Sequence, residues 1–309
     1  ALVQGLITKN VDDAAEIVAS MESGEVATIF ASEKLDVDAA AAVLGSGNMS
    51  AEKAAAILQK ETLGADRAAS ILSSDEITAR KAAQILNSVN IDADKGAAIL
   101  ASENMDADRG AQILNSDNID ANKGAQILNS ANTDANKGAA ILASAHMDAK
   151  KGAELLGSAQ LDAGKATDIL NSDQIDATKA AAIIDQPALT DARSATILGE
   201  VEKTKAGAIL ETVANTKVEG IVANMPEVKL VERLPEMSAV KLHTLSPAVL
   251  FDNLPSVPTE AIAREFAPVV DPSCAPPEST QESAERVIYA VCDTVESAWA
   301  KLVGSPAPI

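Results

Sequence analysis

Aromatic side chains are scarce in this sequence. Phe, Trp and Tyr together make up 2% of the residues, although hydrophobic residues make up 47%. The cores and pockets of ordinary globular enzymes use large aromatic side chains, so this composition argues against an enzyme. Two histidines and two cysteines leave little material for a metal site or a histidine-based catalytic centre. The remaining apolar residues, mainly Ala, Ile, Leu and Val, favour many small helices that lie close together.

Positive charge is also scarce. Asp and Glu total 45 against 25 Lys and Arg, which gives a formal net charge of −20 and a pI near 4.4. Nucleic acids and anionic membrane surfaces bind basic faces, so neither is expected as a partner. Apolar runs stay well short of the roughly 20 residues that span a bilayer. The sequence therefore predicts no transmembrane segment.

An apolar pair recurs through most of the chain at a constant spacing of 14 residues, which indicates internal repeats. The pairs are Val43-Leu44, Ile57-Leu58, Ile71-Leu72, Ile85-Leu86, Ile99-Leu100, Ile113-Leu114, Ile127-Leu128, Ile141-Leu142, Leu155-Leu156, Ile169-Leu170, Ile183-Ile184 and Ile197-Leu198. Pairs spaced by 12 residues lie at both ends of this array: Ile17-Val18 and Ile29-Phe30, then Ile209-Leu210 and Ile221-Val222. We therefore expect an all-α solenoid of short single-helix repeats, each 12–14 residues long.

Each repeat predicts one short helix and one turn. In residues 92–105 Asp92 is the expected N-cap, and roughly ten helical residues run to Ser102. The same cap position holds Ser50, Gly64, Thr78, Asp106, Asp120, Asp134, Asp148, Asp162, Asp176 and Thr190. An apolar residue usually precedes the cap and can staple the entry of the chain onto a helix. So short a helix is unstable alone and must bury Ile99, Leu100 and Met105 against the next unit.

A small residue precedes each pair by three positions. Five consecutive repeats have glycine there, at positions 96, 110, 124, 138 and 152, whereas most others have alanine. Glycine inside a helix costs about 0.5–1 kcal/mol relative to alanine, so its recurrence predicts close backbone approach between neighbouring helices. Because the repeats are nearly identical, the step from each to the next should be constant and should generate a superhelix.

These repeats resemble those in the cytosolic N-terminal domain of MgtE-type magnesium transporters and in the flagellar switch protein FliG. The resemblance rests on residues 105–116 and on the helix openings Met225-Pro226, Leu234-Pro235, Ser246-Pro247 and Leu254-Pro255. It covers roughly residues 10–255 and implies a right-handed α-superhelix. It does not imply magnesium transport, because the membrane segments and the nucleotide-binding module of the transporter are absent from this sequence. The 14-residue step is also longer and more regular than in that family.

The repeat pattern stops near residue 255. We expect a repeat domain over 1–255, a proline-rich linker over 256–279 and a C-terminal helix and tail over 280–309. An amphipathic stripe over 280–303 predicts the helix, which either caps the last repeat or docks on another subunit. Its interface candidates are Tyr289, Trp299 and Leu302. Cys274 and Cys292 are a disulfide candidate if the protein is in an oxidising compartment. In the cytosol we would expect two free thiols.

A cation stands three residues after most caps. The row comprises Lys53, Arg67, Lys81, Lys95, Arg109, Lys123, Lys137, Lys151, Lys165, Lys179 and Arg193. In the first helical turn a cation opposes the helix dipole, so we expect each to reach a carboxylate of a neighbouring repeat in a ladder of surface ion pairs. For most of them a solvated charged face is the favoured interpretation, and a charged stripe that sets lateral register between solenoids is the functional alternative.

Chemical motifs are weak. Asp92 and Asp94 are spaced like two calcium-loop ligands, but Gly96 occupies the position of the third, which disfavours calcium. The Asn-Ser row after the pairs is typical of turns. His146 replaces the Asn of one turn, and His243 lies far from the cysteines, which disfavours zinc. We expect no catalytic, cofactor or metal site.

These features favour a non-enzymatic structural protein, a self-assembling scaffold or a cell-surface or extracellular filament subunit. Its partner would be a second copy of the chain. One alternative is an intracellular binding module with a concave face, and a weaker one is a divalent-cation sensor. A start at Ala1 fits a processed secreted chain or a trimmed one. The expected location is therefore extracellular, with the cytoplasm as the alternative.

Overall fold

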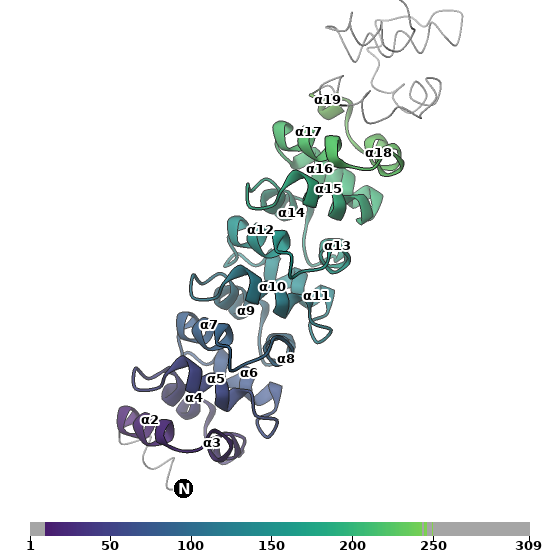
Figure 1. Ribbon diagram of the computed structural model, residues 1–309. Coiled ribbons are helices and arrows are strands. Elements are labelled where there is room, and N and C mark those ends of the chain that lie inside the picture. The colour runs from purple at the N-terminus through teal and green to yellow at the C-terminus, as the bar shows by residue number, and fades with distance from the viewer. Residues whose placement is uncertain (1–9, 243, 246–248, 250–309) are drawn as a thin grey trace, which may run out of the picture. The chain divides into compact units, whose positions relative to one another are not determined.

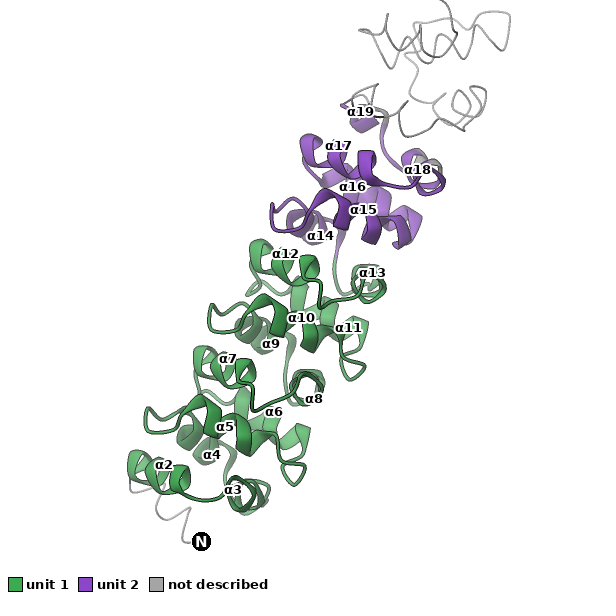
Figure 2. Ribbon diagram, in the orientation of Figure 1, with its two compact units in different colours: residues 1–175 green, residues 176–309 purple. Residues whose placement is uncertain are grey.

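The computed structural model describes residues 10–242, 244, 245 and 249, and every regular element in this part of the chain is a helix (Figure 1). The helices pack against one another in a repeated series, which confirms the predicted α-solenoid. Contacts divide the chain into two compact units, residues 1–175 and 176–309 (Figure 2). The boundary falls inside the repeat array predicted from the sequence.

Unit 1 has one short helix per repeat. The helices are α2 (Val11–Ser20), α3 (Ser23–Phe30), α4 (Val37–Gly45), α5 (Ala51–Leu58), α6 (Ala65–Ser73), α7 (Ala79–Asn87), α8 (Ala93–Ala101), α9 (Ala107–Leu114), α10 (Ala121–Asn129), α11 (Ala135–Ala143), α12 (Ala149–Gly157) and α13 (Ala163–Asn171). Most begin at the predicted caps; the Asp92 carboxylate, for example, accepts the backbone N–H of Lys95 at 2.7 Å. Gly64 has no side chain to cap α6.

Each helix of unit 1 packs mainly against the second helix along the chain, not against the next one. The principal contacts join α2 to α4, α3 to α5, α4 to α6 and so on to α11 and α13. Helices five apart, such as α3, α8 and α13, recur on one side of the unit in the same end-on view (Figure 1). We expected each helix to bury its apolar residues against the next repeat. That prediction was wrong, because the main packing partner is the second repeat along the chain. A constant rotation from one helix to the next can bring the second helix along the chain closest, when each rotation about the axis of the solenoid is large.

The core of unit 1 consists of the apolar pairs and the residues that precede the caps. Both members of every pair from Val43-Leu44 to Ile169-Leu170 are completely buried. Burying one such side chain contributes roughly 1.5–3 kcal/mol, so this repeated pattern supplies most of the driving force for folding. Thr133 is the polar exception before a cap, and its buried Oγ1 donates to the carbonyl oxygen of Ile127 at 3.0 Å.

Gly96, Gly110, Gly124 and Gly138 of the glycine row lie at close contacts, but the contacting group differs from the expectation. A Cβ added to Gly96 would lie 3.1 Å from Cδ1 of Ile127, and one added to Gly110 would lie 3.2 Å from Cδ1 of Ile141. The apolar pair of a helix thus inserts against the small residue of the helix two positions earlier. The close approach is between backbone and side chain, not between two backbones.

Unit 2 contains α14 (Ala177–Ile184), α15 (Asp191–Glu200), α16 (Lys203–Thr212), α17 (Asn215–Asn224), α18 (Glu227–Arg233), a 3-10 turn η1 (Leu234–Glu236) and α19 (Ala239–Leu242). The second-neighbour contact recurs within it, between α14 and α16 and between α15 and α17. Pro226 is the N-cap of α18, one residue earlier than the first-turn position expected from the resemblance.

The tail predictions lie outside the described residues. They comprise the linker over 256–279, the helix over 280–303, the interface candidates Tyr289, Trp299 and Leu302, and the Cys274–Cys292 pair. They stay predictions.

Candidate functional site

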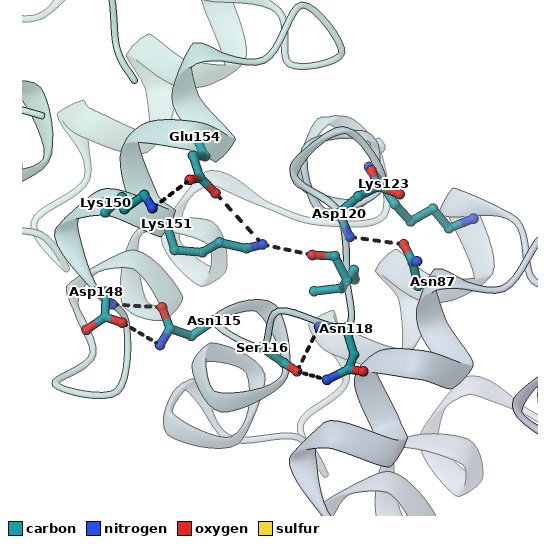
Figure 3. Close-up of polar contacts among 11 residues, drawn as sticks. Asn87, Asn115, Ser116, Asn118, Asp120, Lys123, Asp148, Lys150, Lys151 and Glu154 are labelled. Carbon is teal, nitrogen blue, oxygen red and sulfur yellow. Dashed lines mark hydrogen bonds and ion pairs between the residues drawn. The ribbon is translucent and has the colours of Figure 1, made fainter. Parts of the chain in front are cut away.

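The cation row makes a ladder of hydrogen bonds to backbone carbonyl groups. In α5 to α13 each cation donates to the carbonyl oxygen of the residue 32 positions earlier: Lys53 to Met21, Arg67 to Leu35, Lys81 to Met49, Lys95 to Leu63, Arg109 to Ile77, Lys123 to Ile91, Lys137 to Met105, Lys151 to Ile119 and Lys165 to Thr133. The Lys151 contact measures 2.8 Å (Figure 3). Each cation therefore joins its helix to the loop before the helix two positions earlier.

This geometry corrects the expected ladder of ion pairs. Among the described residues, Lys151 is the one ladder cation of α5 to α13 with a carboxylate within 4 Å, that of Glu154 at 4.0 Å. These acceptors directly precede the N-cap of a helix, but some cations also donate to the carbonyl oxygen of a C-cap serine, as Lys81 does to Ser46 at 3.3 Å and Lys137 to Ser102 at 3.4 Å, where the helix dipole favours positive charge. A cation that is unfavourable at the start of its own helix thus becomes favourable at the end of another.

Burial shifts the ionisation of these side chains. It lowers the pKa of Lys95, Lys123 and Lys137, and nearby carboxylates such as Asp92 and Asp106 act in the opposite direction. The pKa is lowered because the ammonium groups are partly withdrawn from water, and their hydrogen bonds to carbonyl oxygens replace lost hydration. They are structural groups and not a solvated face.

A second ladder starts from the serine that follows most helices of unit 1. Ser130 Oγ accepts the backbone N–H of Asn132 at 3.1 Å and donates to Oδ1 of Asp94, two helices earlier, at 2.7 Å. The Asn132 side chain then donates to the Asp94 carbonyl oxygen at 3.2 Å. Equivalent serine bonds join Ser46 to Asp12, Ser74 to Asp38, Ser102 to Asp66, Ser144 to Asp108, Ser158 to Asn122 and Ser172 to Asn136.

A third ladder joins the end of one helix to the cap of the helix three positions later. Asn115 Oδ1 accepts the backbone N–H of Asp148 at 2.9 Å, while its Nδ2 donates to the Asp148 carboxylate at 3.0 Å (Figure 3). The same two-way contact joins Gln59 to Asp92 and Asn129 to Asp162. The Asn-Ser row therefore connects helices as well as forming turns.

The remaining candidates do not converge. His146 is exposed in its turn, where its backbone N–H donates to Ser144 Oγ at 3.0 Å, and His243 lies outside the described residues. Over the part of the chain that the structure describes, no three His, Cys, Asp or Glu side chains group as a metal site. The carboxylates that suggested calcium are used by the helix cap at Asp92 and by Ser130 at Asp94.

Sequence reasoning identified the ladder residues but not their partners. The signal that could have found them is the joint periodicity of cation, serine and amide, which recurs in most repeats although a single turn needs only one polar residue. Such a surplus indicates contacts between repeats.

Comparison of the chain with protein-family models, curated proteins and solved structures finds no match. The resemblance to the transporter and flagellar-switch repeats therefore stays a prediction. Within the described residues no helix has the length and apolar character needed to cross a bilayer.

Proposed function

We propose that the chain is a non-enzymatic structural protein, a scaffold that assembles with further copies of itself. One observation carries this proposal: the polar side chains that recur in the repeats are used to join helices to one another. Lys123, Ser130 and Asn132 belong to one repeat of unit 1, and each bonds to an earlier helix or loop. Side chains used in this way stabilise the array and are not available for substrate chemistry.

The exposed positions of the repeat support a uniform surface. Turn residues such as Asp75, Glu103, Asp117, Ala131 and Ala145 are exposed and small or acidic. A specific binding face would vary in shape and chemistry along its length, whereas this sequence varies mainly at turn residues such as Val89, Glu103 and Ala131. Association between copies along their sides would bring carboxylates together. We therefore expect it to strengthen as salt screens the repulsion.

The scaffold proposal includes an extracellular or cell-surface location, as the candidate Cys274–Cys292 pair suggests. Mass spectrometry of the protein isolated from its native source, digested without reduction, would detect a peptide pair joined through these cysteines. Two free thiols in that material would favour the cytoplasm.

Light scattering on a size-exclusion column tests the scaffold proposal, under non-reducing conditions, at two protein concentrations and two salt concentrations. A mass well above 31.7 kDa that rises with concentration and salt is the expected result. Electron microscopy of the heavy fraction should then show regular assemblies. A mass near 31.7 kDa under all four conditions would contradict self-assembly.

A binding module is the second candidate, and one feature of unit 2 favours it. Val228 in α18 and Val240 in α19 are 70% and 77% exposed, at the second helical position where most helices of unit 1 carry a polar residue. If the protein is a monomer, replacing both valines with Asp should abolish capture of a partner by the full chain, while substitution of the exposed Val89 should not.

A further inference from the structure

Two cations interrupt the pattern at the second helical position of unit 1. From α4 to α13 this position holds an acidic or neutral residue, except for Arg80 in α7 and Lys150 in α12. Arg80 is exposed, and the Lys150 side chain is exposed beside Glu154, 3.9 Å away (Figure 3). The two cations are 70 residues apart, which is five repeats, and Figure 1 shows α2, α7 and α12 recurring on one side of unit 1. Arg80 and Lys150 therefore form a basic stripe on that side.

The basic stripe replaces residues that other repeats use to join helices. At the same helical position the serine hydroxyl groups of the second ladder are accepted by Asp38, Asp66, Asp94, Asp108, Asn122 and Asn136. Guanidinium and ammonium groups are donors only, so Arg80 and Lys150 cannot accept this bond. Ser116, 36 residues after Arg80, instead accepts the Asn118 side chain at 3.2 Å. The residue 36 positions after Lys150 is Gln186 and not serine. The ladder bond is thus given up twice on one side, which indicates that these cations have another use.

Carboxylates with the same spacing follow helices on the other side of unit 1. Glu103 and Asp173 are exposed, lie two residues after α8 and α13 end, and are also 70 residues apart. Glu33, after α3, continues this spacing but stands beside Lys34. The other sets of equivalent loop residues each include an uncharged member: Gly47, Ala131, Ala145 and Ala159. Figure 1 shows α3, α8 and α13 on the side of the unit away from α2, α7 and α12. Glu103 and Asp173 therefore form an acidic stripe whose charges are spaced like those of the basic stripe.

We propose that the two stripes form a lateral contact between copies of the chain, in which Arg80 and Lys150 of one copy pair with Glu103 and Asp173 of a second copy. The equal spacing favours a second copy as the partner, because the same five-repeat step sets both stripes. Joining one side to the other side is a heterologous contact, so each copy keeps a free stripe that can bind a further copy. The inference rests on the scaffold proposal and adds the surfaces through which the copies meet.

The effect of salt on assembly has two parts in this arrangement. The repulsion between acidic copies acts over a longer distance, and salt screens it. Pairs of opposite charge in close contact are screened less and determine which surfaces meet. Salt therefore brings copies together, and the stripes determine their lateral register.

The test exchanges charge between the stripes in the full chain. One variant carries Arg80→Glu and Lys150→Glu, so both of its stripes are acidic, and the other carries Glu103→Lys and Asp173→Lys, so both are basic. At the salt concentration that assembles the wild type, the weight-average molar mass of each variant alone, from light scattering, should fall about twofold or more, since a lateral contact joins at least two copies. An equimolar mixture should recover the wild-type mass, because each stripe then meets the opposite charge. Both variants remain strongly acidic overall, so a general attraction between them would not explain the recovery.

The matched control is Lys60→Glu with Ala131→Asp and Ala145→Asp, which adds the same negative charge as the first variant at exposed positions outside both stripes. It should keep the wild-type mass, and circular dichroism would establish that every variant is folded. Wild-type assembly by either folded stripe variant alone would overturn the lateral contact, as would a mixture that does not recover or a control that loses assembly equally. A wild type that stays monomeric under every condition would instead overturn the scaffold proposal and this contact with it, so the two failures are distinguishable.

Discussion

At the scale of single residues, the neighbours Lys150 and Lys151 show how position in the repeat decides what a charge does. The Lys150 side chain is 78% exposed and lies 3.9 Å from Glu154, whereas that of Lys151 is 12% exposed and donates to the Ile119 carbonyl oxygen at 2.8 Å. An exposed ion pair contributes little, but a buried carbonyl group without a donor is costly.

We therefore expect Lys151→Met to lower the free energy of unfolding by about 1–3 kcal/mol, because the stem is kept while the Ile119 carbonyl loses its donor. The control Lys150→Met should change it by less than about 0.5 kcal/mol. Urea unfolding of both variants measures the difference. Equal effects would show that Lys151 acts only as a surface charge.

Ser194 in α15 offers the opposite case. Its Oγ is fully buried and has no hydrogen-bond partner, and it stands where other repeats have Ala166 or Ala180. Ser194→Ala should raise the free energy of unfolding by about 1 kcal/mol, because it removes an unsatisfied buried hydroxyl. Thermal or urea unfolding checks the sign. A less stable variant would mean that the hydroxyl is satisfied in solution.

At the scale of the helix, a position needs glycine where a Cβ atom would collide with a neighbouring element, and it tolerates alanine where the space is open. A Cβ on Gly45, at the end of α4, would lie 2.8 Å from the Glu76 carbonyl oxygen, whereas a Cβ on Gly164 in α13 would meet nothing within 4 Å. Backbone atoms are harder to displace than side-chain ends.

Gly45→Ala should therefore destabilise unit 1 by about 1–3 kcal/mol through steric conflict. Gly164→Ala should stabilise it by about 0.5–1 kcal/mol through the better helix propensity of alanine. Urea unfolding of the two variants measures the sign of each change in the free energy of unfolding. If the two variants shift stability in the same direction, the close approach at Gly45 is not a constraint.

The cap of α16 makes stability depend on pH. Glu202 accepts the backbone N–H of Lys205 at 3.0 Å, and this bond lowers the pKa of its carboxyl group. A folded-state pKa below the unfolded value means that the stabilisation is present above the unfolded pKa and is lost as pH falls through the folded pKa.

Glu202→Gln should accordingly be less stable than the wild type at neutral pH. The difference should disappear in acid, where the wild-type carboxyl group is protonated. Thermal unfolding of both proteins across this range tests the linkage. A difference that stays constant with pH would assign the effect to packing and not to charge.

At the scale of the whole molecule, the ladders make the repeats interchangeable. Removing residues 120–133 deletes one repeat, yet Lys137 would then stand 32 residues after Ile91, the partner that Lys123 has now. Ser144 would likewise face Asp94. All three ladders would close again, because contact partners are set by whole-repeat separations.

The deletion of 120–133 should therefore fold, with the loss of one helix in circular dichroism and a cooperative thermal transition. Deletion of residues 127–133 alone should not, because half a repeat moves every later cation and apolar pair out of register. If both deletions fold equally well, the ladders do not determine register.

The sequence by itself determined the repeat unit. The caps, the short helices and the buried pairs all follow from local patterns, because capping and hydrophobic periodicity act within about 14 residues. The tail and the proposed assembly lie beyond what the described residues test.

Only the tertiary structure decided which repeats touch. A 14-residue period is compatible with any constant rotation between helices, and that rotation depends on how Ile127 fits against Gly96, not on propensity. The rotation brings second and third neighbours together, so Lys95 meets the Leu63 carbonyl group and not a carboxylate. The residue types predicted ion pairs, but the cations instead donate hydrogen bonds to loop carbonyl groups, because the winding of the helices brings these groups next to the cations.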